Sequence, residues 1–208
     1  MRIIVLSDTH GKHNKLIMPD GDLLIHCGDI TLKGTKNETI DFLNWFVEQN
    51  YCHKILIAGN HDYYLEENPG FITKTYPNEF FYLFDSGIEI EGIRFWGSPY
   101  TPEYKNMAFN LQRGEELQKH WQKIPENVDI LITHGPPKGI LDNTVNGENA
   151  GCEALLNKVY EIKPQFHLFG HVHEAVGNFS NAYTRFVNAS LTNKAKGLQN
   201  MKPYTFEI

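Results

Sequence analysis

Five apolar runs along the chain each end directly at a polar cluster. They are Ile3–Leu6, Leu23–Ile25, Ile55–Ile57, Ile130–Ile132 and Phe166–Phe169. A continuous apolar run that stops at Gly, Asp, Asn or His is typical of a buried parallel strand ending at a loop. Because ligands bind beyond the carboxyl ends of such strands in α/β sheets, we expect the five loops to meet at one place.

Helical patterns separate these strands. Residues 37–49 place Ile40, Leu43 and Phe46 on one face, with Asn37 as the expected N-cap. Residues 115–123 and 152–161 are two further predicted helices. Strands that alternate with helices predict a layered α/β domain.

A second group of strand-like segments has a different character. They are Phe80–Phe84, Ile88–Ile90, Ile93–Phe95, Thr184–Val187 and Pro203–Ile208. Glu91-Gly92 predicts a tight hairpin between two of them. We expect these segments to form or extend a second sheet, packed face to face with the first and with helices outside. The long loops 63–78, 96–111 and 136–151 lie beside strand ends, where loops are commonly functional.

Composition narrows the class of protein. A length of 208 residues predicts one domain, 1–208. The net charge of -6 gives no general attraction to nucleic acid or anionic membranes, and no apolar stretch approaches the roughly 20 residues that span a bilayer. The opening strand predicts no signal peptide. Three cysteines without a CxxC pair predict reduced, buried thiols and a cytoplasmic protein.

The polar clusters supply the ligand types of a metal centre: two carboxylates, one amide oxygen and four imidazoles. These candidates are Asp8, His10, Asp29, Asn60, His134, His171 and His173. Seven donors are too many for one zinc ion but suit two cations that share a bridging carboxylate. Oxygen and imidazole ligands without thiolate predict two divalent ions, Mn²⁺ first, with Fe or Zn²⁺ as alternatives.

The charge of such a centre favours a phosphoester substrate. Two divalent cations keep about one positive charge after Asp8, Asp29 and a bridging hydroxide are counted, and paired metals clamp the oxygens of an in-line displacement. We expect that hydroxide to attack phosphorus. His61 is the catalytic candidate that assists the leaving group, and Asp62 is expected to hold its other ring nitrogen.

Five motifs together resemble the calcineurin-like metallophosphoesterase superfamily. They are Asp8-x-His10, Gly28-Asp29, Gly59-Asn60-His61-Asp62, His134-Gly135 and Gly170-His171-x-His173, in the family's order. The resemblance implies a four-layer αββα sandwich of two mixed β-sheets flanked by helices. It also implies one metal held by Asp8, His10, Asp29 and His173, and a second held by Asp29, Asn60, His134 and His171.

A closer resemblance rests on four segments. Residues 133–139, 97–99, 170–174 and 187–190 are similar to the small phosphodiesterase group that includes the mammalian metallophosphoesterase domain-containing proteins. Some members of that group lack one histidine of the last motif and are poor catalysts. This chain has both His171 and His173, so the resemblance implies a competent site that hydrolyses phosphodiesters or cyclic nucleotides.

Three hypotheses remain open at this point. The first is a dinuclear metal-dependent phosphoesterase with a small phosphoester or nucleotide substrate. The second is a catalytically weak nucleotide-binding or scaffold protein with the same fold. The third, a nuclease, requires a basic groove, and nucleic acid is not an expected partner because the chain is acidic. The oligomeric state is not predicted.

Several other side chains have two open interpretations. Trp96, Tyr100 and Tyr104 either stack on a nucleobase or pack in the core. His13, His53, His120 and His167 match no ligand position and are expected to have a structural or surface role. His26, inside a strand, is expected to be a core or interface histidine with its hydrogen bonds satisfied.

Overall fold

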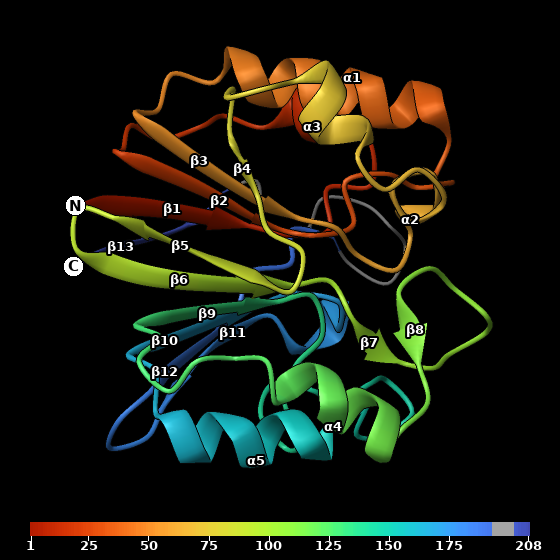
Figure 1. Ribbon diagram of the computed structural model, residues 1–208, viewed down its shortest axis with the longest axis vertical. Helices are drawn as coiled ribbons and strands as arrows, with labels where there is room; N and C mark the ends of the chain where they lie inside the picture. The colour runs from red at the N-terminus through yellow and green to blue at the C-terminus, as the bar shows by residue number, and fades with distance from the viewer. Residues whose placement is uncertain (193–201) are drawn as a thin grey trace.

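Two large β-sheets pack face to face in the computed structural model, which describes residues 1–192 and 202–208 (Figure 1). The first sheet has the order β13-β1-β2-β3-β4 and consists of β1 (Arg2–Leu6), β2 (Leu23–Cys27), β3 (His53–Ile57), β4 (Phe81–Tyr82) and β13 (Tyr204–Glu207). The second has the order β11-β12-β10-β9-β6-β5 and consists of β5 (Ser86–Ile90), β6 (Ile93–Ser98), β9 (Ile130–Thr133), β10 (Phe166–Phe169), β11 (Gly177–Ser180) and β12 (Arg185–Asn188). A small two-stranded sheet pairs β7 (Thr101–Pro102) with β8 (Asn110–Leu111).

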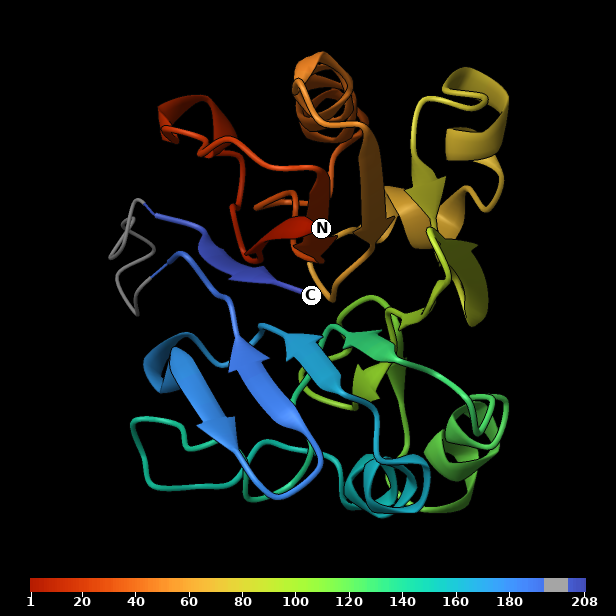
Figure 2. The same cartoon turned by 90° about the vertical axis from the view of Figure 1, so that its left-hand side faces the viewer.

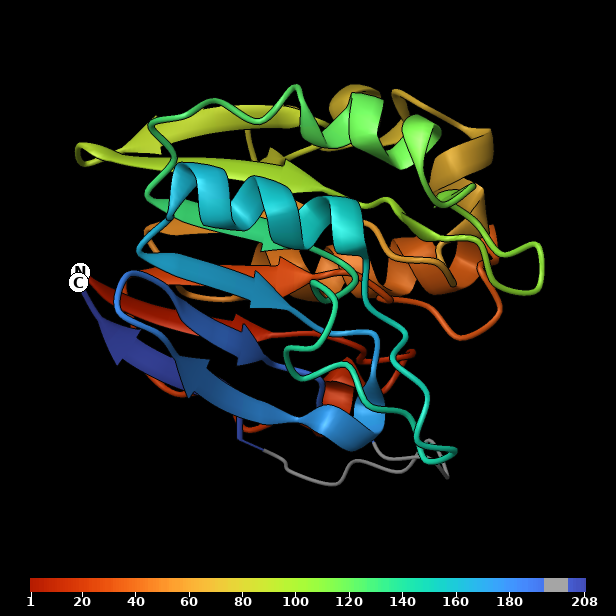
Figure 3. The same cartoon turned by 90° about the horizontal axis from the view of Figure 1, so that it is seen from below.

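Helices cover the outer face of each sheet. The first sheet carries α1 (Lys36–Glu48), α2 (Tyr63–Glu67) and α3 (Phe71–Thr75), and the second carries α4 (Glu115–Trp121) and α5 (Glu153–Ile162) (Figures 2 and 3). Single turns of 3-10 helix lie at His13–Lys15 and His173–Ala175. The predicted four-layer αββα sandwich is therefore confirmed.

The apolar runs divide their side chains between two cores because successive residues of a strand face opposite sides of the sheet. Ile3 and Val5 of β1 join the core between the sheets, whereas Ile4 and Leu6 pack toward α1 beside Phe42. A third core joins the second sheet to α4 and α5. Burial on both faces explains why these strands are continuously apolar rather than alternating.

The partition of strands between the sheets differs from the expectation. The C-terminal strand β13 and the aromatic strand β4 belong to the first sheet, where β13 pairs antiparallel with β1 and β4 pairs parallel with β3. The predicted strands β9 and β10 instead lie in the second sheet. Hydrophobic pattern identifies a buried strand but not its neighbour, because both sheets contribute to the same central core.

Smaller features also correct the sequence interpretation. Helix α1 is capped by Thr35 rather than Asn37: Thr35 Oγ1 accepts from the Glu38 amide and Glu38 accepts from the Thr35 amide, which is a capping box. The loop 63–78 contains α2 and α3, and β11 was not predicted. Cys52 is exposed, whereas Cys27 and Cys152 are buried as expected; all three are free thiols.

The parallel strands place all five motif loops at one end of the molecule. In Figure 1 the carboxyl ends of β1, β2, β3 and β9 point away from the chain termini. The termini themselves meet at the other end, where the Met1 ammonium donates to Ile208 O over 2.8 Å. Among the described residues, no helix combines the length and the apolar character needed to cross a bilayer.

Candidate metal centre

The seven predicted ligands converge at the carboxyl ends of strands from both sheets. Asp8 and His10 follow β1, Asp29 follows β2, and Asn60 follows β3. His134 follows β9, and the pair His171 and His173 follows β10. The first five are buried and the last two are half-buried. The structure therefore brings together every residue that the sequence singled out as a ligand.

One half of the cluster combines Asp8, His10 and His173. His173 Nε2 lies 3.3 Å from Asp8 Oδ1 and 3.3 Å from His10 Nε2. Single ligand atoms from these three side chains all lie within 4.8 Å of one another. That spacing is compatible with a shared cation.

The other half is built around the Asn60 side chain. Asn60 Oδ1 lies 2.8 Å from His134 Nε2 and 2.8 Å from His171 Nδ1. An amide oxygen between two imidazoles supplies three of the donors that the resemblance assigns to the second metal.

Asp29 lies between the two halves. Its Oδ1 is 3.3 Å from His134 Nε2, and its Oδ2 is 3.7 Å from His10 Nε2. One carboxylate therefore turns one oxygen toward each half, which is the arrangement a bridging ligand requires.

The ring tautomers show that the donor set fits cations. A carbonyl oxygen only accepts, so His10 Nδ1 donates to Thr31 O and His134 Nδ1 donates to Cys27 O, each over 2.9 Å. In the neutral rings the Nε2 lone pairs then face carboxylate or amide oxygens. Facing lone pairs repel unless a proton or a metal ion lies between them. Backbone carbonyls are also common outer partners of metal-bound histidines, whose second ring N–H they accept.

The same crowding of acceptors shifts the proton affinities. Burial lowers the pKa of His134, but Asp29 outweighs it and raises that pKa to about 9. Burial raises the pKa of Asp29, yet His134 and His10 bring it well below its usual value. Burial lowers the pKa of His171 to about 4, so near neutral pH this ring is uncharged and can offer a nitrogen lone pair to a cation. Asp29 is therefore ionised, and its charge stabilises positive charge placed beside it.

Four of the candidate ligands have left-handed backbone conformations. The φ angles are 57° at Asp8, 43° at His10, 58° at Asp29 and 68° at His171. Such conformations cost of order 1–3 kcal/mol for residues other than glycine and concentrate at functional sites. The surrounding sheets stabilise these loops enough to keep the strained geometry.

Two glycines permit the close approach of the loops. A Cβ at Gly28 would lie 2.7 Å from His134 Nδ1, and a Cβ at Gly59 would overlap Asp29 and lie 2.7 Å from His134 Cε1. Side chains at these positions would displace the imidazole. The glycines before Asp29 and Asn60 are therefore steric requirements of the site.

His61 lies beside the cluster. Its amide donates to Asp29 Oδ1 over 2.7 Å, and its ring lies edge-on to His10 with centroids 4.6 Å apart. The His61 Nδ1–H donates to Leu32 O over 2.8 Å. The expectation that Asp62 holds this nitrogen is therefore wrong, because the carbonyl of Leu32 takes that place.

Asp62 instead supports the backbone of the ligand loops. Its buried carboxylate accepts from the amides of Asp29, Ile30, Thr31 and Gly59 and from the Thr31 hydroxyl, at 2.8–3.3 Å. Burial, followed by the nearby Asp29 charge, raises the pKa of Asp62 to about 6 despite these donors. Asp62 is absent from the lining of the cavity, so it fixes the β2 and β3 loops from behind.

The cluster opens into a cavity of about 530 Å³. Asp29, Asn60, His61, His171 and His173 form its floor, and the loops around residues 102–107 and 144–150 form its walls. Tyr104 is exposed on this wall, whereas Trp96 and Tyr100 pack against the core of the second sheet. Of the three aromatic residues with open roles, Tyr104 alone faces the site.

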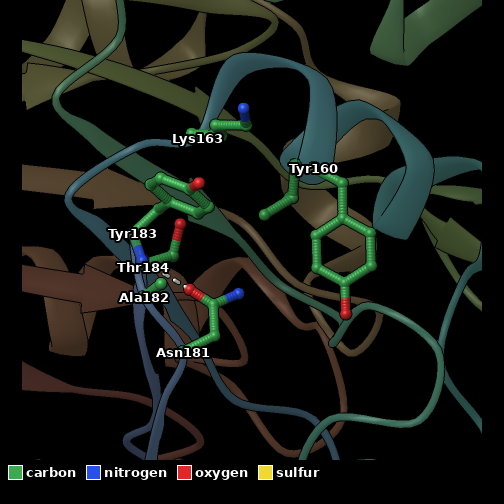
Figure 4. A pocket seen from close by; sticks show the side chains of 7 residues that line it. Tyr160, Lys163, Asn181, Ala182, Tyr183 and Thr184 are labelled. Carbon is green, nitrogen blue, oxygen red and sulfur yellow. Dashed lines mark hydrogen bonds between the residues drawn. The ribbon is translucent and has the colours of Figure 1, made fainter.

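Another hollow lies away from the cluster, between α5 and the turn that joins β11 to β12 (Figure 4). It measures about 250 Å³ and is lined by Tyr160, Lys163 and Tyr183 among others. None of the predicted ligands lines it, and nothing in it resembles a metal site.

The remaining histidines have structural partners, as expected. His13, His53, His120 and His167 contact Asp41, Glu91, Asp85 and Thr133, respectively, and His26 contacts Thr9. Two further residues orient the loops of the site. Asn188 donates to Val172 O between His171 and His173, and buried Asp142 accepts from the amides of Gly139 and Gly151. Asn188 lies in one of the four segments of the closer resemblance, whereas Asp142 lies in none of them.

Comparisons with known proteins agree with this geometry. The sequence model of the family described as calcineurin-like phosphoesterase matches residues 1–175. Metallophosphoesterase domain-containing protein 1 of Homo sapiens is 39% identical over 214 residues, which are 91% of this chain and 66% of that protein. UPF0046 protein K07C11.7 of Caenorhabditis elegans is 37% identical over 221 residues, which are 100% of this chain and 75% of that protein.

A solved structure shares the fold at low identity. The phosphopantetheinyl hydrolase of Mycobacterium tuberculosis superposes with a TM-score of 0.57 at 15% identity, covering 90% of this chain and 88% of that one. The likeness supports the architecture alone. The chain spans 66% of the length of its human relative. The family match over most of the sequence shows that the chain belongs to the calcineurin-like phosphoesterase family.

Proposed function

We propose that this protein is a dinuclear metal-dependent phosphoesterase that hydrolyses phosphodiesters, including cyclic nucleotides. The observation that carries the proposal is the position of Asp29, whose two carboxylate oxygens face two separate groups of imidazoles. Family membership supports a metal-dependent phosphoesterase. The preference for diesters rests on the resemblance to the small phosphodiesterase group.

The assignment of ligands follows the two halves of the cluster. Asp8, His10, Asp29 and His173 would hold one ion, and Asp29, Asn60, His134 and His171 would hold the other. Mn²⁺ is the first candidate because the donors are oxygen and imidazole. Bound as a pair, such ions lower the pKa of water and stabilise the attacking and leaving oxygens of an in-line displacement.

The protein's own residues supply orientation and a proton. The His61 amide and Nδ1 are both fixed, so His61 Nε2 is the ring atom left to face the cavity. When protonated, it donates to the phosphoryl group or to the leaving oxygen, which assists departure of the alcohol. The Asp8 and Asp29 carboxylates cancel only half the charge of two divalent ions, so the centre attracts a phosphodiester anion.

The test is hydrolysis of bis(p-nitrophenyl) phosphate by the purified protein with Mn²⁺, before and after removal of metal with EDTA. We expect activity that EDTA abolishes and Mn²⁺ restores. His61→Ala is expected to lower kcat by about 10²–10⁴-fold while both ions remain bound. His53→Ala serves as the control because its ring is half-buried outside the cavity. Absence of metal-dependent turnover on monoesters, diesters and cyclic nucleotides would refute the proposal in favour of a binding or scaffold role.

A further inference from the structure

The orientation of the Asn60 amide decides whether this side chain can bind a cation. Its Oδ1 faces His134 and His171, and its Nδ2 lies 2.9 Å from Met107 Sδ. Rotation of the amide by 180° would exchange oxygen and nitrogen and turn an N–H₂ group toward the metal position. An amide nitrogen has no lone pair to give a cation and its hydrogens repel positive charge.

The thioether distinguishes the two orientations. A methionine sulfur accepts a hydrogen bond but donates none, so it can pair with Asn60 Nδ2 and not with Oδ1. Rotation would bring the amide oxygen against the sulfur lone pairs. When the rings of His134 and His171 act as metal ligands, their nitrogens facing Oδ1 no longer donate to it. Met107 is the hydrogen-bond partner of Asn60 Nδ2 among the described residues.

The segment that carries Met107 is itself fixed to Asn60. The Ala108 amide donates to Asn60 O over 3.1 Å. Asn110 holds the same turn, because its Oδ1 accepts from the Met107 amide and its Nδ2 donates to Thr101 Oγ1 over 2.8 Å. Thr101 is fully buried, so the turn is tied to the interior of the protein. The sulfur therefore has a defined position relative to the amide that it contacts.

We propose that Met107 is a positioning residue that locks the Asn60 amide with its oxygen toward the second metal. The inference rests on the proposed function, since it requires Asn60 to be a metal ligand. Met107 lies in the loop between β7 and β8, outside every motif that identifies the family. Its effect on the reaction passes through Asn60.

The direct test is Met107→Leu, which keeps an apolar side chain of similar size and removes the acceptor. Mn²⁺ binding to the metal-free protein is measured by calorimetric titration, which is independent of turnover. We expect one of the two ions to bind about tenfold less tightly, as is typical when an outer partner of a metal ligand is removed. Met107→Gln restores an acceptor oxygen on a side chain of similar length and is expected to recover most of the affinity. Met18→Leu is the control for replacing a methionine by a leucine, because Met18 is half-buried beside the α1 core.

A double-mutant cycle separates the amide lock from loop packing. Asn60→Asp removes the N–H₂ group that the sulfur contacts, so Met107→Leu should then leave Mn²⁺ affinity unchanged. Wild-type affinity in Met107→Leu alone, or an equal loss in both backgrounds, would overturn the lock and leave the proposed function intact. Failure of the wild-type protein to bind two Mn²⁺ ions would instead overturn the proposed function, and the lock with it.

Discussion

Removal of the Asp62 carboxylate is the sharpest test of how the ligand loops are held in place. This buried group accepts hydrogen bonds from four backbone amides on the loops that carry Asp29 and Asn60, and from the Thr31 hydroxyl. In Asp62→Ala these donors lose their shared acceptor. The two loops would then lack the carboxylate that joins them.

The expected loss follows from the number of donors. A buried amide left without a partner costs about 1–3 kcal/mol. Four amides at the low end of this range give a loss of about 4 kcal/mol in the free energy of unfolding. This is a large share of the roughly 5–15 kcal/mol that stabilises a typical domain. Asp62→Asn keeps one acceptor oxygen but turns an N–H₂ group toward other donors, so its loss is expected to be smaller but measurable.

Urea unfolding of the metal-free proteins, followed by circular dichroism, measures this loss. EDTA is present throughout, so that bound metal does not stabilise the folded state. We expect a lower midpoint in the order wild type, Asp62→Asn, Asp62→Ala, with the slope unchanged. If Asp62→Ala unfolds within about 1 kcal/mol of wild type but has lost turnover with both ions bound, Asp62 acts in the chemistry and the structural reasoning is wrong.

Three further predictions use other parts of the site and core. Gly28→Ala is expected to lower the midpoint of thermal unfolding more than Gly114→Ala does. Both glycines have a φ of 96°, so the backbone strain is matched. A Cβ at Gly28 would lie 2.6 Å from a backbone oxygen, whereas a Cβ at Gly114 would have open space. Burial lowers the pKa of His167 to about 3. Between pH 6.5 and pH 3 this imidazole is therefore protonated in the unfolded chain but not in the folded protein. The free energy of unfolding falls as the pH falls through this range. His167→Gln should reduce this slope by about 1.4 kcal/mol per pH unit in urea titrations, and an unchanged slope would contradict the assignment. Asp142→Ala removes the acceptor of the Gly139 and Gly151 amides, so faster hydrogen exchange in the 136–151 loop and a raised KM with little change in kcat are expected.

The convergence of the candidate ligands was predictable from the sequence because each of them follows a buried strand. The position of a residue at a strand end is a local property, and the apolar run before Asp29 or His134 reports it. The parallel arrangement then places the ends together without knowledge of strand order. This explains why the candidate ligands lie together although β9 and β10 belong to a different sheet from β1, β2 and β3.

The partners of the ligands were not predictable, because they depend on contacts between loops that are distant in sequence. Adjacency in sequence suggests that Asp62 contacts the His61 ring, whereas its carboxylate accepts from amides about 30 residues away. Met107 lies 47 positions from Asn60, in a loop without a distinctive pattern. Within a strand, the position of a residue determines which face of the sheet its side chain lies on. The contacts of a loop depend instead on how the two sheets pack together.

The proposed function depends on Asp29 bridging two ions, and anomalous diffraction from crystals grown with Mn²⁺ would show whether it does. We expect two anomalous peaks about 3.5–4 Å apart, each next to a different oxygen of Asp29, with Asn60 beside one and His173 beside the other. A single peak, or two peaks of which only one contacts Asp29, would contradict it.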